Sequence, residues 1–310
     1  MGQSFCNCDR GSRGEEVTVP PSNMMVPCLR EEHHVNAPVC TADAVVISGN
    51  CGSRRMVLEG GVLYEGGWLA DQKHGEGVLT FLDGARYVGQ FCRDQRSGYG
   101  AFYYPNGALY CGQWANDLQH GNGEEHWADS SVFTGEFRLG EKHGRGCFSW
   151  SSRCRYEGEF DANDMHGEGT YMWNDGRGFC GQWIRNRMGP SGRMWWSDGK
   201  VYEGEFHNNR KHGDGTLEWP DGRIYNGQWH NGLQHGIATA RTLEGHSCRS
   251  RWKHGAFIEW LRETMLSESQ RLNEYQGDAS TSGLPILTDP GYDVPIGGPQ
   301  KLHDPMANKQ

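Results

Sequence analysis

Residues 202–222 read Tyr-Glu-Gly-Glu-Phe-His-Asn-Asn-Arg-Lys-His-Gly-Asp-Gly-Thr-Leu-Glu-Trp-Pro-Asp-Gly, and this pattern decides the fold. It opens on an aromatic lead ring, followed two residues later by a glycine and two further on by a second ring. The same order recurs every 23 residues in eight units, without insertion or deletion. A fixed period is typical of a repeat array in which each unit buries its apolar face against its neighbours. The lead rings are Tyr64, Tyr87, Tyr110, Phe133, Tyr156, Phe179, Tyr202 and Tyr225.

Each unit also carries a histidine-glycine pair and a third ring. Histidine stands ten residues after the lead ring in six of the eight units, whereas Ser97 and Gly189 replace it in the other two. We assign structural roles to these columns, as packing and turn positions of the repeat. Representative positions are Tyr64, Gly66, Trp68, His74 and Gly75 in the first unit, Tyr156, Gly158, His166 and Gly167 in the fifth, and Tyr202, Gly204, His212 and Gly213 in the seventh.

The columns predict strands rather than helices. Side chains alternate between the two faces of a strand, so the lead ring, glycine and second ring share one face. The intervening residues are polar, as at Glu203 and Glu205, which predicts a solvated opposite face. Asp-Gly pairs such as Asp221-Gly222 are strong hairpin turns. The expected fold is therefore all-β: an elongated open meander of eight 23-residue hairpins, with about sixteen strands.

The pattern Tyr-x-Gly-x-Trp/Phe-x5-His-Gly-x-Gly-x3-Trp-x-Asp-Gly resembles the MORN (membrane occupation and recognition nexus) repeat. The resemblance covers residues 64–254. It implies an open β-sheet rod used for attachment to proteins or phospholipids, often at membranes, cell-division structures or cilia, and it does not imply catalysis. The sixth unit departs from the pattern, because Gly189-Pro190 replaces His-Gly. Arg187, Met188, Gly189 and Pro190 are accordingly a candidate partner-facing site.

Outside the array the chain changes character. Residues 1–40 show little periodicity and are expected to be disordered, and residues 277–310, rich in Gly, Pro and Asp, form an expected second disordered segment. Residues 41–63 keep the register weakly, which predicts a degenerate hairpin that caps the array. In residues 255–276 the spacing of apolar residues predicts a C-terminal helix, either a cap on the last strand or a dimerisation or partner helix. Its apolar positions are Ile258, Leu261, Met265 and Leu272.

The first residues, Met1-Gly2-Gln3-Ser4-Phe5-Cys6-Asn7-Cys8, indicate lipid attachment. Gly2 is a candidate for N-myristoylation and Cys6 and Cys8 are candidates for S-palmitoylation, because stable anchoring needs a second acyl chain. The sixth position of the motif favours Ser or Thr, whereas Cys6 stands there, so an unmodified terminus is the alternative. With an odd number of cysteines, no CxxC pair and no long apolar run, we expect a cytoplasmic protein, held peripherally at a membrane by acylation.

Enzyme signals are missing from the sequence. Equivalent histidines of adjacent units are expected two strands apart, roughly 9–10 Å, too far for one column to supply the four ligands of a structural zinc site. The chain contains no Gly-x-Ser-x-Gly elbow, and its Gly-x-Gly strings lack a following Gly-Lys-Ser/Thr and precede strands. We therefore predict no catalytic residue, no cofactor and no metal site.

The charge of the chain narrows the class of partner. A net charge of −9 argues against nucleic acid, which needs a basic surface. The favoured function is a non-enzymatic scaffold that binds protein partners through its sheet. Recognition of phospholipid head groups by the repeats is one alternative, and a soluble part of a ciliary or cytoskeletal assembly is another. Whether the chain forms a homo-oligomer stays open.

Overall fold

The computed structural model describes residues 52–243 and 245–261, which form nineteen β-strands and one short 3-10 turn, η1 (Glu59–Gly61). Gly2, Cys6, Cys8 and the segments 1–40 and 277–310 lie outside the described residues. The strands are β1 (Ser53–Val57), β2 (Leu63–Leu69), β3 (Gln72–Thr80), β4 (Arg86–Cys92), β5 (Gln95–Tyr103), β6 (Leu109–Ala115), β7 (Leu118–His126), β8 (Val132–Arg138), β9 (Glu141–Ser149), β10 (Arg155–Asp161), β11 (Asp164–Met172), β12 (Gly178–Ile184), β13 (Arg187–Trp195), β14 (Val201–His207), β15 (Arg210–Glu218), β16 (Ile224–His230), β17 (Leu233–Arg241), β18 (Ser247–Lys253) and β19 (Ala256–Trp260).

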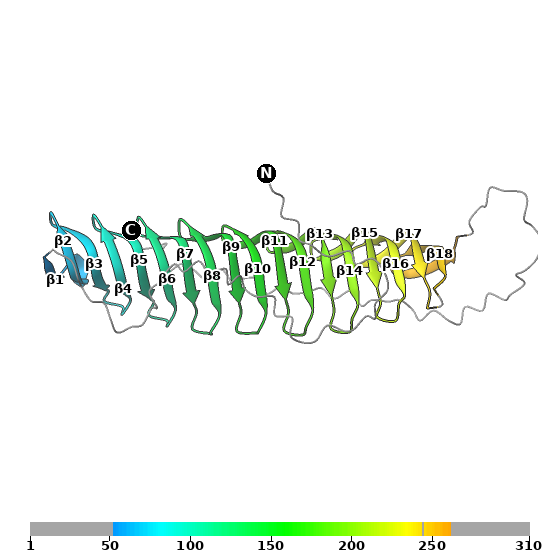
Figure 1. Ribbon diagram of the computed structural model, residues 1–310, viewed down its shortest axis with the longest axis horizontal. Helices are drawn as coiled ribbons and strands as arrows, with labels where there is room; N and C mark the ends of the chain where they lie inside the picture. The colour runs from blue at the N-terminus through cyan, green and yellow to red at the C-terminus, as the bar shows by residue number, and fades with distance from the viewer. Residues whose placement is uncertain (1–51, 244, 262–310) are drawn as a thin grey trace, which may run out of the picture. The chain divides into compact units, whose positions relative to one another are not determined.

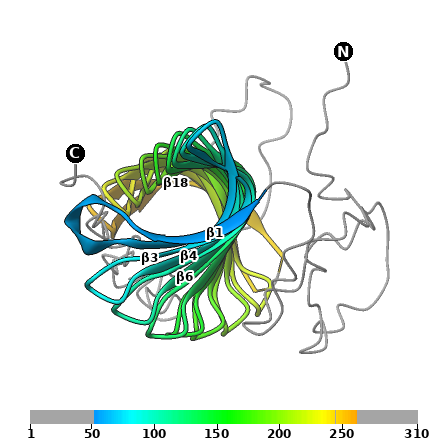
Figure 2. The same cartoon turned by 90° about the vertical axis from the view of Figure 1, so that its left-hand side faces the viewer.

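All nineteen strands belong to one sheet, in which each strand pairs antiparallel with the next along the chain. The strands stand side by side in chain order (Figure 1). Seen along this row, the sheet curves but does not close (Figure 2). The predicted all-β open meander of eight hairpin repeats is thus confirmed, and β1, β18 and β19 extend the sheet beyond those eight units.

Two kinds of turn alternate along the sheet. The predicted turns lie between units, where Gly84 has a φ of 90° and donates its N–H to Phe81. A second turn lies within each unit and was not predicted: its two central residues, such as Ala70 and Asp71, both have positive φ. Two successive left-handed residues are the signature of a type I′ turn, which matches the twist of the flanking strands. Asp, Asn or Gly recurs at the second of these residues because these types tolerate that conformation best.

The core is a continuous column of aromatic rings. Tyr64 is fully buried and meets Trp68 of its own unit and Phe91 of the next edge to face, with 5.2 Å between ring centroids in each pair. The same contacts recur through the later units, up to Tyr225 and Trp252. Each unit therefore shares its rings with the following one, as a repeat array requires.

The glycine columns allow the lead ring to lie on the backbone. Gly66 and Gly77 are paired across strands β2 and β3, and a methyl group on Gly77 would meet the Tyr64 ring at 2.5–2.8 Å. The ring then reaches across, and the hydroxyl of Tyr64 donates to the carbonyl of Gly67 at 2.9 Å. Five further lead tyrosines make the equivalent bond: Tyr87, Tyr110, Tyr156, Tyr202 and Tyr225.

Burial of these phenols predicts unfolding in alkali. Burial raises the pKa of Tyr64 to about 12, and it also raises the pKa of the other lead tyrosines above the usual value of about 10. The neutral phenols stabilise the folded state fully below about pH 10, and this contribution is lost as the pH rises through the folded-state values. We expect the β circular dichroism signal to be lost over the same pH range in which tyrosinate absorbance at 295 nm appears. Complete ionisation of the lead tyrosines while the β signal persists would contradict this expectation.

The C-terminal end of the sheet corrects one prediction. Residues 256–260, expected to begin a helix, form strand β19 instead, and residues 262–276 lie outside the described residues. The repeat continues there because Trp252 occupies a second-ring position and packs on Tyr225 with 5.5 Å between centroids. This contact extends the ring column by one unit, and Phe257 then packs on Trp252. At the other end, the described part of the predicted capping hairpin is the single strand β1 followed by η1.

Candidate interaction surfaces

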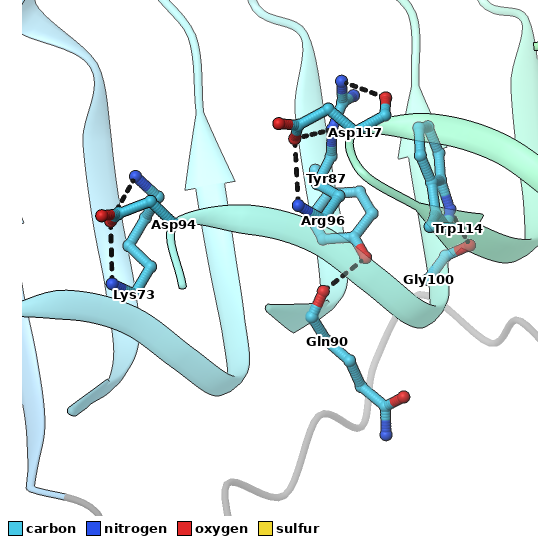
Figure 3. A network of polar contacts seen from close by, with 8 residues as sticks. All are labelled: Lys73, Tyr87, Gln90, Asp94, Arg96, Gly100, Trp114 and Asp117. Atoms are coloured by element: carbon cyan, nitrogen blue, oxygen red, sulfur yellow. Dashed lines mark hydrogen bonds and ion pairs between the residues drawn. The ribbon is translucent and has the colours of Figure 1, made fainter. Parts of the chain in front are cut away.

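A column of cations is buried inside the array. Arg96 is 7% exposed, lies over the ring of Trp114 at 4.5 Å, and pairs through Nε with Oδ1 of Asp117 at 3.1 Å (Figure 3). Lys142 and Lys211 occupy the equivalent place in later units and also lie over aromatic rings. Cation–π contacts hold all three charges in the protein interior, and ion pairs with Asp117 and Glu125 add to them at Arg96 and Lys142. They are therefore not available to bind an anionic ligand at the surface.

Neighbouring units are joined at their type I′ turns. Asp94 accepts a hydrogen bond from the backbone N–H of Lys73 at 2.9 Å (Figure 3). The N–H of Asp94 in turn donates to the carbonyl of Lys73 at 3.0 Å. Burial alone would raise the pKa of Asp94, but its bonds to Lys73 outweigh burial and lower it. The sequence signal for this junction is the Asp/Asn/Gly column seven residues after each lead ring.

The junction predicts a difference between two substitutions of Asn163, which has a φ of 70° and accepts the N–H of Lys142 at 2.9 Å. Asn163→Ala should lower the free energy of unfolding by about 1–2 kcal/mol, because it loses the bond and places a Cβ in the left-handed region. Asn163→Gly, which copies Gly140 of the preceding unit, should cost less because glycine adopts this φ freely. Chemical denaturation of the two variants measures the difference. Equal losses would contradict the conformational argument.

The histidine column has mixed surroundings. Nδ1 of His143 lies 3.3 Å from a carboxylate oxygen of Asp161, whereas Nδ1 of His212 accepts the backbone N–H of Asn231 at 3.5 Å. The glycines that follow His74, His166 and His212 have φ values of 75°, 59° and 59°, so the pair marks a left-handed step in the strand. The glycine of each pair thus shapes the hairpin, while the contacts of the histidine differ between units.

The irregular sixth unit keeps the register of the sheet. Met188 is 2% exposed and fills the position taken by Lys142 and Lys211 in other units. Gly189 is also buried and is joined to Pro190 by a cis peptide bond. Arg187 and Pro190 are exposed, and Arg187 donates to the side chain of Asn208 at 2.8 Å. A partner-facing role for this unit stays a prediction, and it now rests on Arg187 and Pro190.

The face opposite the rings, here called the outer face, divides into engaged and open positions. Gln90 and its equivalents are engaged, since Oε1 of Gln90 accepts the N–H of Tyr99 at 2.9 Å within its own hairpin. Thr134, Glu203 and Asn226 occupy one open position of three different units and are exposed. Other exposed outer-face residues carry charges of both signs: Arg145, Glu168, Arg193 and Asp214. The side chains of the outer face therefore vary from unit to unit, while the strands that carry them are arranged in the same way.

The described ranges contain no helix long and apolar enough to cross a membrane. They also contain no group of three or more His, Cys, Asp or Glu side chains arranged to hold a metal ion. The repeated side chains of this part of the chain are engaged in packing and in hydrogen bonds between strands.

One sheet of equivalent hairpins, with a shared ring column and a variable outer face, defines an open repeat scaffold. The model of the MORN repeat family matches residues 64–86, 87–109, 110–132, 133–155, 156–176, 179–201, 202–222 and 225–239. These segments make up more than half of the 310 residues, and the chain belongs to the MORN repeat family. No curated protein matches the sequence.

The solved structures that match this chain are distantly similar to it. The wild-type TCP10 domain of Danio rerio CPAP is 13% identical, with a TM-score of 0.38 over 67% of this chain and 99% of that one. The TCP domain of Drosophila melanogaster SAS-4, solved in complex with a proline-rich motif of Ana2, is 12% identical, with a TM-score of 0.34 over 50% of this chain and 85% of that one. At such TM-scores no conclusion about function follows.

Proposed function

We propose that this MORN-repeat chain is a non-enzymatic scaffold that binds protein partners on its outer face, at the cytoplasmic side of a membrane. One observation carries the proposal: the rings, cations and Asp/Asn residues of the repeat contact neighbouring units, whereas outer-face residues such as Glu203 and Asp214 are exposed and differ between units. Variable positions on a constant frame are how repeat arrays present binding surfaces. A surface of mixed charge suits a protein partner.

The alternative of lipid head-group recognition by the repeats has less support. Anionic head groups require a basic footprint, and each exposed Lys or Arg near the membrane surface contributes about 1 kcal/mol. Arg96, Lys142 and Lys211 are buried, and the outer-face arginines alternate with acids. The net charge of −9 also disfavours binding to an anionic surface. We therefore assign membrane attachment to acyl chains on Gly2, Cys6 and Cys8.

Fractionation of cells tests the attachment. The wild-type chain should sediment with membranes, and a variant combining Gly2→Ala, Cys6→Ser and Cys8→Ser should become soluble, because a single hydrophobic signal anchors weakly and none remains. Mass spectrometry of the N-terminal peptide checks the acyl groups directly. A triple variant that stays on membranes would contradict acyl anchoring and favour lipid recognition by the repeats. A wild-type chain without a membrane fraction would instead support a soluble ciliary or cytoskeletal assembly.

A further inference from the structure

Five histidines form an unbroken row at the C-terminal end of the sheet. The ring centroids of consecutive members lie 5.1–5.7 Å apart, and the row passes from β14 to the turn after β18. Only two of the five belong to the histidine column of the repeat; His207 and His230 end their strands and His254 lies in a turn. The row consists of His207, His212, His230, His235 and His254.

Within the row, His212 and His230 have the geometry of a chelating pair. Their ring centroids are 5.1 Å apart. Two imidazoles bound to one tetrahedral ion at a metal–nitrogen distance of about 2.0–2.1 Å have centroids about 5 Å apart. The corresponding positions three units earlier hold His143 and Asp161, whose side chains approach to 3.3 Å. Side chains at these two positions therefore reach one another across adjacent hairpins.

Both rings present a lone pair to the same residue, Asn231. Nδ1 of His212 accepts its backbone N–H at 3.5 Å, and Nε2 of His230 lies 3.2 Å from its Nδ2. An amide NH₂ only donates, so Nε2 of His230 must be the acceptor in that contact. The lone pairs of the two imidazoles thus both point to atoms of Asn231. A flip of the Asn231 side-chain amide by about 180° would place its oxygen there as a third ligand.

We propose that His212, His230 and Asn231 bind a divalent first-row transition-metal ion, such as Zn²⁺. Neutral imidazole is a preferred ligand for these ions, and the amide oxygen and water supply the remaining positions. His230 is exposed and His212 half-buried, so an ion and its water reach the site from solvent. The described residues contain no group of three or more His, Cys, Asp or Glu ligands, and two imidazoles with an amide form a weaker, open site.

The histidine column by itself does not reveal this site, because its members in adjacent units are two strands apart. His230 belongs to a different column, five residues after its lead ring, and the curvature and pairing of the strands bring it beside His212. Two units earlier, His166 is equivalent to His212 and Ile184 is equivalent to His230. His166 therefore lacks the second imidazole and provides a comparison within the same chain.

Isothermal titration of the full-length chain with Zn²⁺, under a non-chelating reductant, tests the site. His230→Ala copies Ala115, its equivalent in the third unit, and should remove one bound ion per chain. The control is His166→Ser, which copies Ser97 in the histidine column and should bind as many ions as the wild type. Equal binding by the wild type and His230→Ala, or an equal loss in the control, would overturn the proposal.

A gain of binding provides an independent test that does not depend on how His230→Ala folds. Ile184→His combined with Arg185→Asn recreates beside His166 the arrangement of His212, His230 and Asn231 two units later. This double variant should bind one ion more per chain than the wild type, whereas Ile184→Ala should bind the same number as the wild type. Circular dichroism confirms that each variant is folded. No additional ion in a folded double variant would contradict the geometric argument.

Discussion

Replacing Lys142 by Met lowers the free energy of unfolding by about 3–5 kcal/mol, the loss expected when one partner of a buried ion pair is removed. Nζ of Lys142 lies 2.7 Å from a carboxylate oxygen of Glu125, and their side chains are 11% and 16% exposed. Methionine fits the space, since Met165 and Met188 fill the equivalent position of the next two units. The cost therefore comes from the charge left on Glu125, and urea denaturation measures it.

The matching double variant isolates that cause. Glu125→Phe with Lys142→Met recreates Phe148 and Met165, the residues found at the same positions one unit later, both buried. Because replacing a buried ion pair by packed apolar residues is often neutral or stabilising, the double variant should be at least as stable as the wild type. If instead it is as unstable as Lys142→Met alone, the loss arises from packing at this position and the ion-pair explanation is wrong.

Substituting Gly123 by Ala lowers the free energy of unfolding by about 2–3 kcal/mol, because a Cβ there would overlap the lead ring of its unit. The added methyl would lie 2.5 Å from the hydroxyl oxygen of Tyr110 and 2.7 Å from two of its ring carbons. Tyr110 is fully buried and its hydroxyl is held by the carbonyl of Gln113 at 2.8 Å, so the ring has little freedom to move. Denaturation of the variant measures the loss.

A double-mutant cycle identifies the ring as the source of that loss. Tyr110→Leu is destabilising by itself, but Gly123→Ala introduced into the Tyr110→Leu background should cost at least about 1 kcal/mol less than in the wild type, because the overlapping ring is gone. Additive effects of the two substitutions would show that the alanine acts through the backbone and not through contact with Tyr110.

The repeat pattern predicted most of the fold because each recurring position of the repeat has one structural role. A ring at Tyr64, a glycine at Gly66 and a ring at Trp68 can share a face only in a strand, and Asp-Gly marks the turns between units. The helix expected from residue 255 was wrong over residues 256–260. The spacing of apolar residues is compatible with a helix, but the ring of Trp252 just before this segment continues the repeat. Trp252 extends the ring column, and β19 pairs with the strand that carries it.

Two other features are visible in the sequence, but their role depends on contacts with a neighbouring unit. Asp94 and Asn163 belong to a column of turn residues whose side chains bond one unit back. Glu125 is the one acid in a column that elsewhere holds apolar residues such as Phe148 and Leu217, and its partner Lys142 is supplied by the next unit. Contacts between columns, as in the histidine row, depend on the register and curvature of the sheet, and a column-by-column comparison cannot find them.

Site-specific photo-crosslinking in cells tests most directly whether the outer face binds protein. A photoreactive residue at Glu203, exposed on the outer face, should yield a discrete protein adduct, whereas one at Asp221, exposed at a turn between units, should not. Thr134 and Asn226 offer two further outer-face positions at the equivalent place of other units. Adducts at these positions and not at Asp221 would support a scaffold that binds through its outer face. Equal adducts at Asp221, or no protein adduct at any of the three outer-face positions, would contradict it.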